Sequence, residues 1–133
     1  MRKKIVLIVI IAVVILTVAI SLATLNSPIR KARKTSSEFV AMLLAGEASK
    51  TYQMFTPQAQ QNELLGTWTF SVDKVITYCY NKQANYASGQ QTGSLVTLKY
   101  KVACRGGNYI FTTTLIDTNK AWEVQSFVSQ LQS

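Results

Sequence analysis

The sequence has 133 residues, enough for one domain of ordinary size, and its formal net charge is +8. Residues 1–34 contain seven basic side chains and no acidic one, whereas residues 35–133 contain seven basic and six acidic side chains, which leave +1. Nucleic-acid binding depends on a basic face that contacts phosphates. A nearly neutral domain does not supply such a face, so the composition argues against a nucleic-acid partner.

Residues 1–4 form a short basic tail, and the next segment, Ile5–Leu25, is predicted to be a transmembrane helix. Its 21 residues contain no charge, and at about 1.5 Å per residue they cover the roughly 30 Å hydrocarbon core of a bilayer. A single span must be helical because its backbone groups find no other hydrogen-bond partners in lipid. A cleaved signal peptide is the alternative, since Ser21-Leu22-Ala23 is an acceptable cleavage site, although its apolar region is usually only about 7–15 residues.

Residues 26–34 are predicted to be a basic linker at the membrane surface, where side chains would meet anionic lipid head groups. The basic side chains concerned are Arg30, Lys31, Arg33 and Lys34. Three basic residues precede the apolar segment and four follow it, so the positive-inside rule does not fix the orientation.

Residues 35–133 are predicted to form one domain that begins with helices. Thr35 and Glu38 have the spacing of a capping box, which predicts the start of a helix, and Gly46 is typical of its end. Thr56-Pro57 predicts an N-cap followed by proline in the first helical turn. Gly66 is expected to close the helical part.

From Thr67 onward the apolar residues alternate with polar ones, as in Trp68, Phe70 and Val72, which predicts a strand. Four further strands are expected from the same period and from the turn residues between them. They are Val75–Ala87, Ser94–Arg105, Asn108–Ile116 and Ala121–Val128.

The expected strand pairing gives one apolar face. If the first loop is centred between Gln91 and Thr92, Cys79 lies directly opposite Cys104, and the next two turns continue the same face. That face is predicted to carry Val96, Leu98, Tyr100, Val102, Tyr109, Phe111, Thr113, Leu115, Trp122, Val124, Ser126 and Val128. The expected fold class is therefore α+β: a transmembrane helix, then helices packed on a curved antiparallel sheet of four to five strands.

Opposed residues in an antiparallel pair have Cβ atoms about 4.5–5.5 Å apart, which favours a disulfide between Cys79 and Cys104. Two free buried cysteines are the alternative. A disulfide belongs in an oxidising compartment, so we expect a single-pass protein of the cell membrane with its C-terminal domain outside the cytoplasm. A zinc site is not expected, because the chain has no histidine and two thiolates do not complete the usual four ligands.

The absence of histidine removes the commonest general base. Most acidic side chains are explained by helix ends or turns, and Asp73 is the least explained of them. No catalytic residue and no cofactor are therefore expected, with an isomerase- or dehydratase-like enzyme as the alternative.

The aromatic residues suggest a ligand pocket on the concave side of the sheet, although the same residues could simply form the core. The candidates are Trp68, Tyr100, Tyr109, Phe111 and Trp122. Tyr78, Tyr80 and Tyr86 are expected to project the other way, where an exposed aromatic row could form a partner surface.

Two parts of the domain resemble a known superfamily. Phe39–Glu47 and Ala48–Ala59 are similar to the helical opening of nuclear-transport-factor-2-like domains, and Thr114–Val124 is similar to their final hairpin. The resemblance covers about residues 35–128. It implies a cone-shaped fold of the kind found in small membrane-anchored bacterial envelope proteins. Catalytic members of the superfamily use Asp, His or Tyr groups inside the cone, and this sequence does not match that pattern.

Two functions follow from these expectations. The first is a membrane-anchored envelope protein whose non-catalytic domain binds a protein or a small apolar ligand, with membrane lipid as a further partner. The alternative is a structural component of a secretion or pilus-like assembly.

Overall fold

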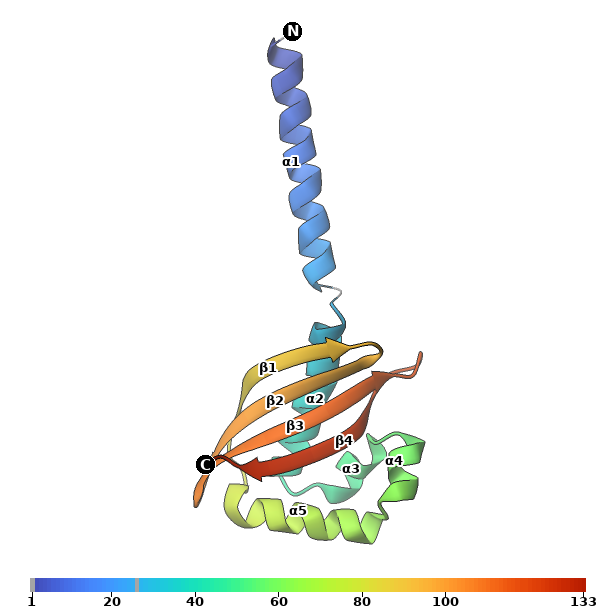
Figure 1. Cartoon of the computed structure of the whole chain (residues 1–133), viewed down its shortest axis with the longest axis vertical. Coiled ribbons are helices and arrows are strands. Elements are labelled where there is room, and N and C mark those ends of the chain that lie inside the picture. Colours follow the sequence, from blue (N-terminus) through green and yellow to red (C-terminus); the bar gives the residue numbers. More distant parts are fainter. Residues whose placement is uncertain (1, 26) are drawn as a thin grey trace.

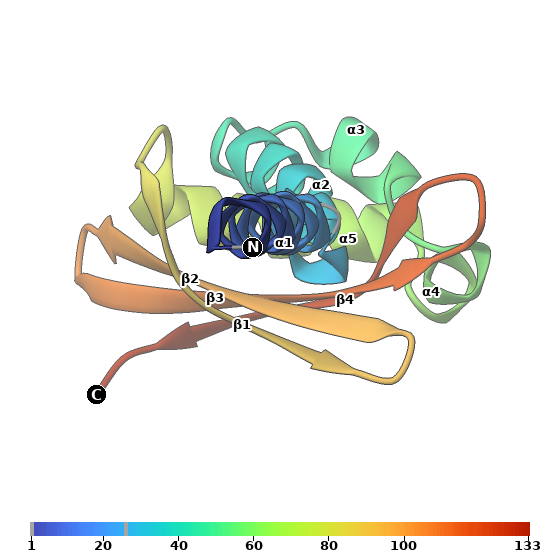
Figure 2. The same cartoon turned by 90° about the horizontal axis from the view of Figure 1, so that it is seen from above.

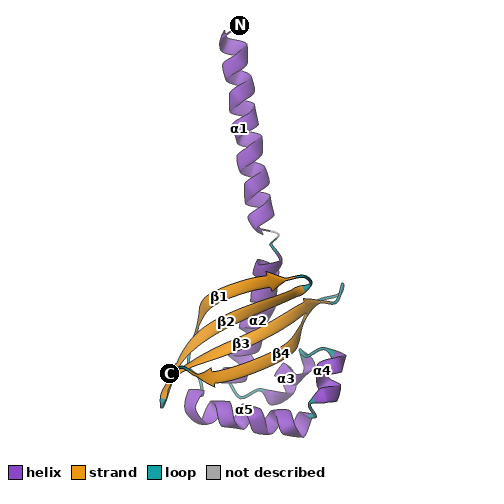
Figure 3. Cartoon of the chain, viewed as in Figure 1, coloured by secondary structure: helices purple, strands orange, loops and turns teal. Residues whose placement is uncertain are grey.

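A computed structural model describes residues 2–25 and 27–133, with the side chains of 20–25 outside the description. Five helices precede an antiparallel sheet of four strands in the described part of the chain (Figures 1 and 3). The elements are α1 Arg2–Leu25, α2 Pro28–Leu44, α3 Ala48–Gln53, α4 Pro57–Asn62, α5 Leu65–Cys79, β1 Ala84–Thr92, β2 Leu95–Cys104, β3 Gly107–Asp117 and β4 Trp122–Leu131. The expected α+β class is confirmed.

Helix α1 extends away from the rest of the molecule, as Figure 1 shows. Its Ile, Leu and Val side chains from Ile5 to Val18 are exposed. Among the described residues, no helix combines the length and the apolar character needed to cross a membrane. The transmembrane helix expected at Ile5–Leu25 is thus present as a helix but is not identified as a span.

Helix α2 begins earlier than expected. Proline occupies its first turn at Pro28, where the missing N–H costs nothing, so the linker expected at residues 26–34 is helical from that point. Ala32 and Ser36 are fully buried, which places this first part of α2 inside the domain. The helix start expected at Thr35 was therefore wrong.

The end of α2 agrees with the sequence. Gly46 has a φ of 78°, in the left-handed region that favours glycine. Its N–H donates to the Leu43 carbonyl at 3.0 Å, and the Glu47 N–H donates to the Met42 carbonyl at 3.0 Å. These two bonds form a Schellman motif, which satisfies the last carbonyls of the helix.

The largest correction concerns residues 65–79, which form helix α5 and not the strands expected from Thr67 and Val75. Trp68, Val72 and Cys79 are buried at helical spacing, whereas Phe70 is 61% exposed. The alternation seen in the sequence ends at Val72, and the burial follows a period near 3.6.

Strands β1 to β4 pair in chain order, and the helices of the domain lie on one side of the sheet (Figure 2). The first hairpin pairs Thr92 with Leu95 and Tyr86 with Tyr100, so the expected register was shifted. The pairing expected between Cys79 and Cys104 as strand residues was wrong, because β1 begins only at Ala84. The inner side chains of β2 and β3 agree with the sequence: Val96, Leu98, Tyr100, Val102, Phe111, Thr113 and Leu115 are buried and Tyr109 is half-buried.

A β-bulge changes the inner face of β4. Thr114 pairs with Ser126, but the next residue, Leu115, pairs with Val124. The extra residue reverses the side-chain alternation after Val124. Ser126 and Val128, expected inside, are exposed, and Phe127 instead packs against the core.

The core joins α2, α5 and the sheet through aromatic rings. Phe39 is fully buried, and its ring centroid lies 5.5–6.0 Å from those of Phe55, Trp68 and Phe127. The Phe39–Phe55 pair is edge-to-face and the other two are tilted, and such aromatic pairs add to the stabilisation from apolar burial.

Candidate functional site

The predicted disulfide between Cys79 and Cys104 is confirmed, with a Cα–Cα distance of 4.7 Å. It joins the end of α5 to the end of β2, so the partners belong to a helix and a strand. Beside it, the Arg105 N–H donates to the Tyr78 carbonyl at 2.8 Å. The disulfide therefore holds the C-terminal end of α5 against the hairpin formed by β2 and β3.

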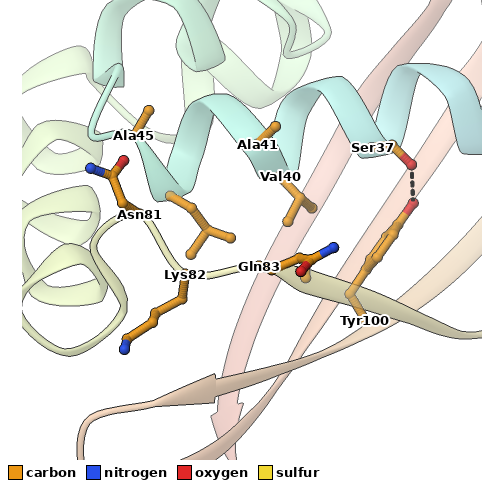
Figure 4. A pocket seen from close by; sticks show the side chains of 10 residues that line it. Ser37, Val40, Ala41, Ala45, Asn81, Lys82, Gln83 and Tyr100 are labelled. Carbon is orange, nitrogen blue, oxygen red and sulfur yellow. Dashed lines mark hydrogen bonds between the residues drawn. The ribbon is translucent and has the colours of Figure 1, made fainter.

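A first cleft of about 400 Å³ lies between α2 and the segment that leads from α5 into β1 (Figure 4). We call it the α2 cleft. Its lining residues are Ser37, Val40, Ala41, Leu44, Ala45, Asn81, Lys82, Gln83, Ala84 and Tyr100. At one end, the Ser37 Oγ and the Tyr100 hydroxyl are 3.2 Å apart and hydrogen-bonded. The polar groups of this cleft are amides, hydroxyls and one ammonium.

A second cleft of about 470 Å³ lies between α5 and the C-terminal half of β4. We call it the α5–β4 cleft. Its lining residues are Glu63, Trp68, Ser71, Lys74, Val75, Tyr78, Cys79, Tyr109, Phe127, Val128 and Ser129. Four of these are aromatic, and the two charged ones have opposite signs. This mixture of apolar walls with a few polar groups is typical of binding clefts.

Trp68 contributes its ring and not its N–H to this cleft. The indole N–H donates to the Thr51 Oγ1 at 2.9 Å, and both residues are buried. The donor is therefore satisfied within the protein, and Trp68 offers an apolar surface to a ligand.

The five residues expected to line one ligand pocket do not come together. Trp68 and Tyr109 line the α5–β4 cleft, whereas Tyr100 lines the α2 cleft. Phe111 is fully buried in the core, and Trp122 is half-buried and lines neither cleft.

The sequence interpretation missed the α5 side of the α5–β4 cleft. Trp68, Ser71, Val75 and Tyr78 are spaced by three, four and three residues, which places them on one face of a helix. That spacing was the signal that could have identified them. Phe127 could not have been found, because its inward position depends on the bulge.

The expected exposed aromatic row does not form on the sheet. Tyr78 lies on α5 and Tyr80 follows it, both exposed, whereas Tyr86 lies on β1. The guanidinium of Arg33 lies 3.7 Å from the centre of the Tyr86 ring. This is a cation–π contact, and it fixes one of the basic side chains of α2 against the sheet.

The basic side chains of Arg30, Lys31, Arg33 and Lys34 are all exposed on the first turns of α2. Ser27, Ile29, Arg30, Arg33 and Tyr86 line a shallow depression at this end of the domain. The four residues thus form a basic surface next to the end of α1.

Asp73, the acidic residue without a structural explanation in the sequence, is exposed on α5 and lines neither cleft. Within residues 2–25 and 27–133, no three His, Cys, Asp or Glu side chains are grouped so that they could hold a metal ion.

Comparison with known proteins gives no family model, no curated protein and no solved structure that matches this chain.

Proposed function

We propose that this protein is a membrane-anchored binding module whose α5–β4 cleft takes up part of another protein outside the cytoplasm. The observation that carries the proposal is the cleft itself. Aromatic side chains line the cleft. Its two charged residues, Glu63 and Lys74, come from different segments of the chain, and Asp73 does not line it. Such a lining favours binding over catalysis.

The proposed anchor is α1. Its sequence from Ile5 to Leu25 has 21 residues without a charge, and it includes Ile20–Leu25, whose side chains lie outside the description. In the described part, the apolar side chains are exposed on every side of the helix. A helix that is apolar all round needs an apolar environment, and a bilayer provides one.

The basic surface of α2 supports the same arrangement. Arg30, Lys31, Arg33 and Lys34 follow α1 directly and lie on a helix that packs into the domain. Basic side chains next to a membrane gain about 1 kcal/mol each from anionic lipids. We propose that lipid head groups contact this surface and hold the domain against the bilayer.

The disulfide supports the proposed compartment, since such bonds persist mainly in oxidising surroundings. The arrangement of helices on one side of an antiparallel sheet agrees with the proposed nuclear-transport-factor-2-like fold.

Photo-crosslinking in native membranes tests the binding role. Benzoylphenylalanine replaces Lys74 in the cleft, and the matched control replaces Lys99, an exposed lysine on β2 that lies outside both clefts. We expect one discrete adduct with another protein from position 74 and none from position 99. A ladder of self-crosslinks would instead favour a structural component of an assembly, and no adduct at position 74 would contradict the binding role.

A second measurement tests the topology. A membrane-impermeant maleimide is applied to intact cells before and after treatment with a reductant. We expect labelling of Cys104, the more accessible of the two cysteines, only after reduction and without opening the cells. Labelling that needs permeabilised cells would place the domain on the cytoplasmic side.

A further inference from the structure

Strand β4 lies at an edge of the sheet, and part of its free edge is already paired by the chain itself. The Val124 N–H donates to the Met54 carbonyl at 2.8 Å, and the Thr56 N–H donates to the Val124 carbonyl at 2.9 Å. Phe55 thus forms a parallel bridge to Val124. At Pro57 the chain turns into α4 and leaves the edge.

The rest of this edge has no strand partner in the described part of the chain. The Gln132 N–H donates to the Asn108 carbonyl at 2.8 Å, which directs residue 132 toward β3. The direction of the backbone N–H and carbonyl groups alternates along a strand. Those of residues 127, 129 and 131 therefore point away from β3. Phe127, Ser129 and Leu131 therefore present N–H and carbonyl groups on the open edge.

These open groups border the α5–β4 cleft, because Phe127 and Ser129 line it. Helix α5 forms the opposite wall with Trp68 and Tyr78. The cleft is thus bounded by a strand edge on one side and by a helix on the other. A single extended chain that pairs with this edge would satisfy its open N–H and carbonyl groups.

The charges of the cleft indicate the chemistry of the occupant. Lys74 and Glu63 make no ion pair, since the one ion pair among the described residues joins Lys50 and Glu47. The Lys74 ammonium lies 4.5 Å from the centre of the exposed Phe70 ring, and no described carboxylate is paired with it, so an incoming segment can place an acidic side chain near Lys74 and a basic one near Glu63. Its apolar side chains would meet the aromatic walls.

We propose that the α5–β4 cleft binds an extended segment of a partner polypeptide, which pairs with β4 as a fifth strand of the sheet. The inference rests on the proposed binding role of this cleft and names the class of its partner. Main-chain hydrogen bonds to residues 127, 129 and 131 would provide affinity, and the aromatic walls would select side chains at alternate positions.

The test uses the full-length protein in lipid nanodiscs and, as its probe, the tightest-binding eight-residue peptide from a displayed library. Two N-methylated versions of that peptide carry methyl groups on alternate residues. We expect one version to bind at least about thirtyfold more weakly, because it loses two or more of its hydrogen bonds to the carbonyls of residues 127, 129 and 131, each worth about 1 kcal/mol, and the other to bind as before.

Two variants of one position provide a matched control. Ser129→Pro removes the edge N–H without removing a bond to β3, and an edge strand tolerates proline at such a position. Ser129→Ala keeps the N–H and removes only the hydroxyl. We expect Ser129→Pro to bind the peptide at least about fivefold more weakly than Ser129→Ala, the matched variant that keeps the N–H.

Each other outcome overturns the inference. Equal binding of both methylated peptides, or full binding by Ser129→Pro, would show that side chains alone hold the ligand and would leave the proposed function intact. Self-association of the protein that Ser129→Pro abolishes would assign the edge to a second copy. A library without a binder would also overturn the inference, and crosslinking at Lys74 would then decide the proposed function separately.

Discussion

The disulfide offers the most direct test of how this domain is stabilised. Cys79 and Cys104 are 25 positions apart in the sequence. Closing a loop of that length in the unfolded chain lowers its entropy by an amount worth about 3.5 kcal/mol at 25 °C. For a domain of this size, the same free energy corresponds to roughly 15 °C in the melting temperature. We therefore expect reduction to lower the melting temperature by that amount.

The loss of stability on reduction should be greatest in the C-terminal half of α5. The first half of α5 is held by the buried Trp68 and Val72, whereas near its end the fully buried side chain is Cys79 itself. Without the bond, the C-terminal half of α5 should open more often than the sheet. Amide hydrogen exchange in residues 75–79 should then rise more than exchange in β2 and β3.

The assay compares three samples of full-length protein in nanodiscs by circular dichroism during heating: oxidised, reduced, and the double variant Cys79→Ala/Cys104→Ala. The reduced sample and the double variant should melt at similar temperatures. Any extra loss in the variant measures the cavity left at Cys79, which is only 1% exposed. If reduction changes neither the melting temperature nor the exchange of α5, the stabilising role assigned to the bond is wrong.

Three further substitutions test the packing and the helix end, with chemical denaturation as the measurement. Ser36→Ala removes the buried 2.6 Å hydrogen bond between the Ser36 and Thr113 hydroxyls, leaves Thr113 with only its 3.5 Å bond to the Leu98 carbonyl, and should cost about 1–2 kcal/mol; adding Thr113→Val should cost less than the sum of the two single changes. Trp68→Phe removes the indole hydrogen bond and some buried surface, and should cost about 1–3 kcal/mol; an unchanged stability would contradict the role of that bond. Gly46→Ala should cost about 1 kcal/mol or more because of its positive φ, whereas Gly66→Ala, which meets nothing within 4 Å, should be neutral or stabilising.

The sheet was predictable because its physical signals agree with one another. The apolar residues of β2 and β3 alternate without interruption. Gly106 lies in the turn between these strands and Gly107 begins β3, both with positive φ. Only one register buries such a face completely, so the inner side chains of these strands could be assigned from the sequence.

Helix α5 was assigned as strands because its local signals conflict. Thr67, Thr69, Val72 and Val75 are β-branched, which lowers helix propensity and favours a strand. The tertiary structure outweighs that preference. A helix buries Trp68, Val72 and Cys79 together and leaves Phe70 exposed, whereas a strand would place Phe70 beside Trp68 and turn Cys79 to the opposite face. The disulfide prediction was correct even so, because a helix end can bring Cys79 as close to Cys104 as a neighbouring strand can.

The candidate site was the least predictable part of the molecule. The α5–β4 cleft depends on a helix that was assigned as a strand and on a bulge that turns Phe127 inward. A bulge adds one residue without a distinctive composition, so neither its position nor its effect on the facing residues could be deduced from the sequence.

The close succession of α1 and α2 has a consequence for how a partner is met. Helix α1 ends at Leu25, α2 begins at Pro28, and Ala32 is already fully buried. With α1 in a bilayer, two residues would separate the anchor from α2, so the domain would stay close to the membrane surface. Encounters with a partner would then depend on lateral diffusion in the plane of the bilayer.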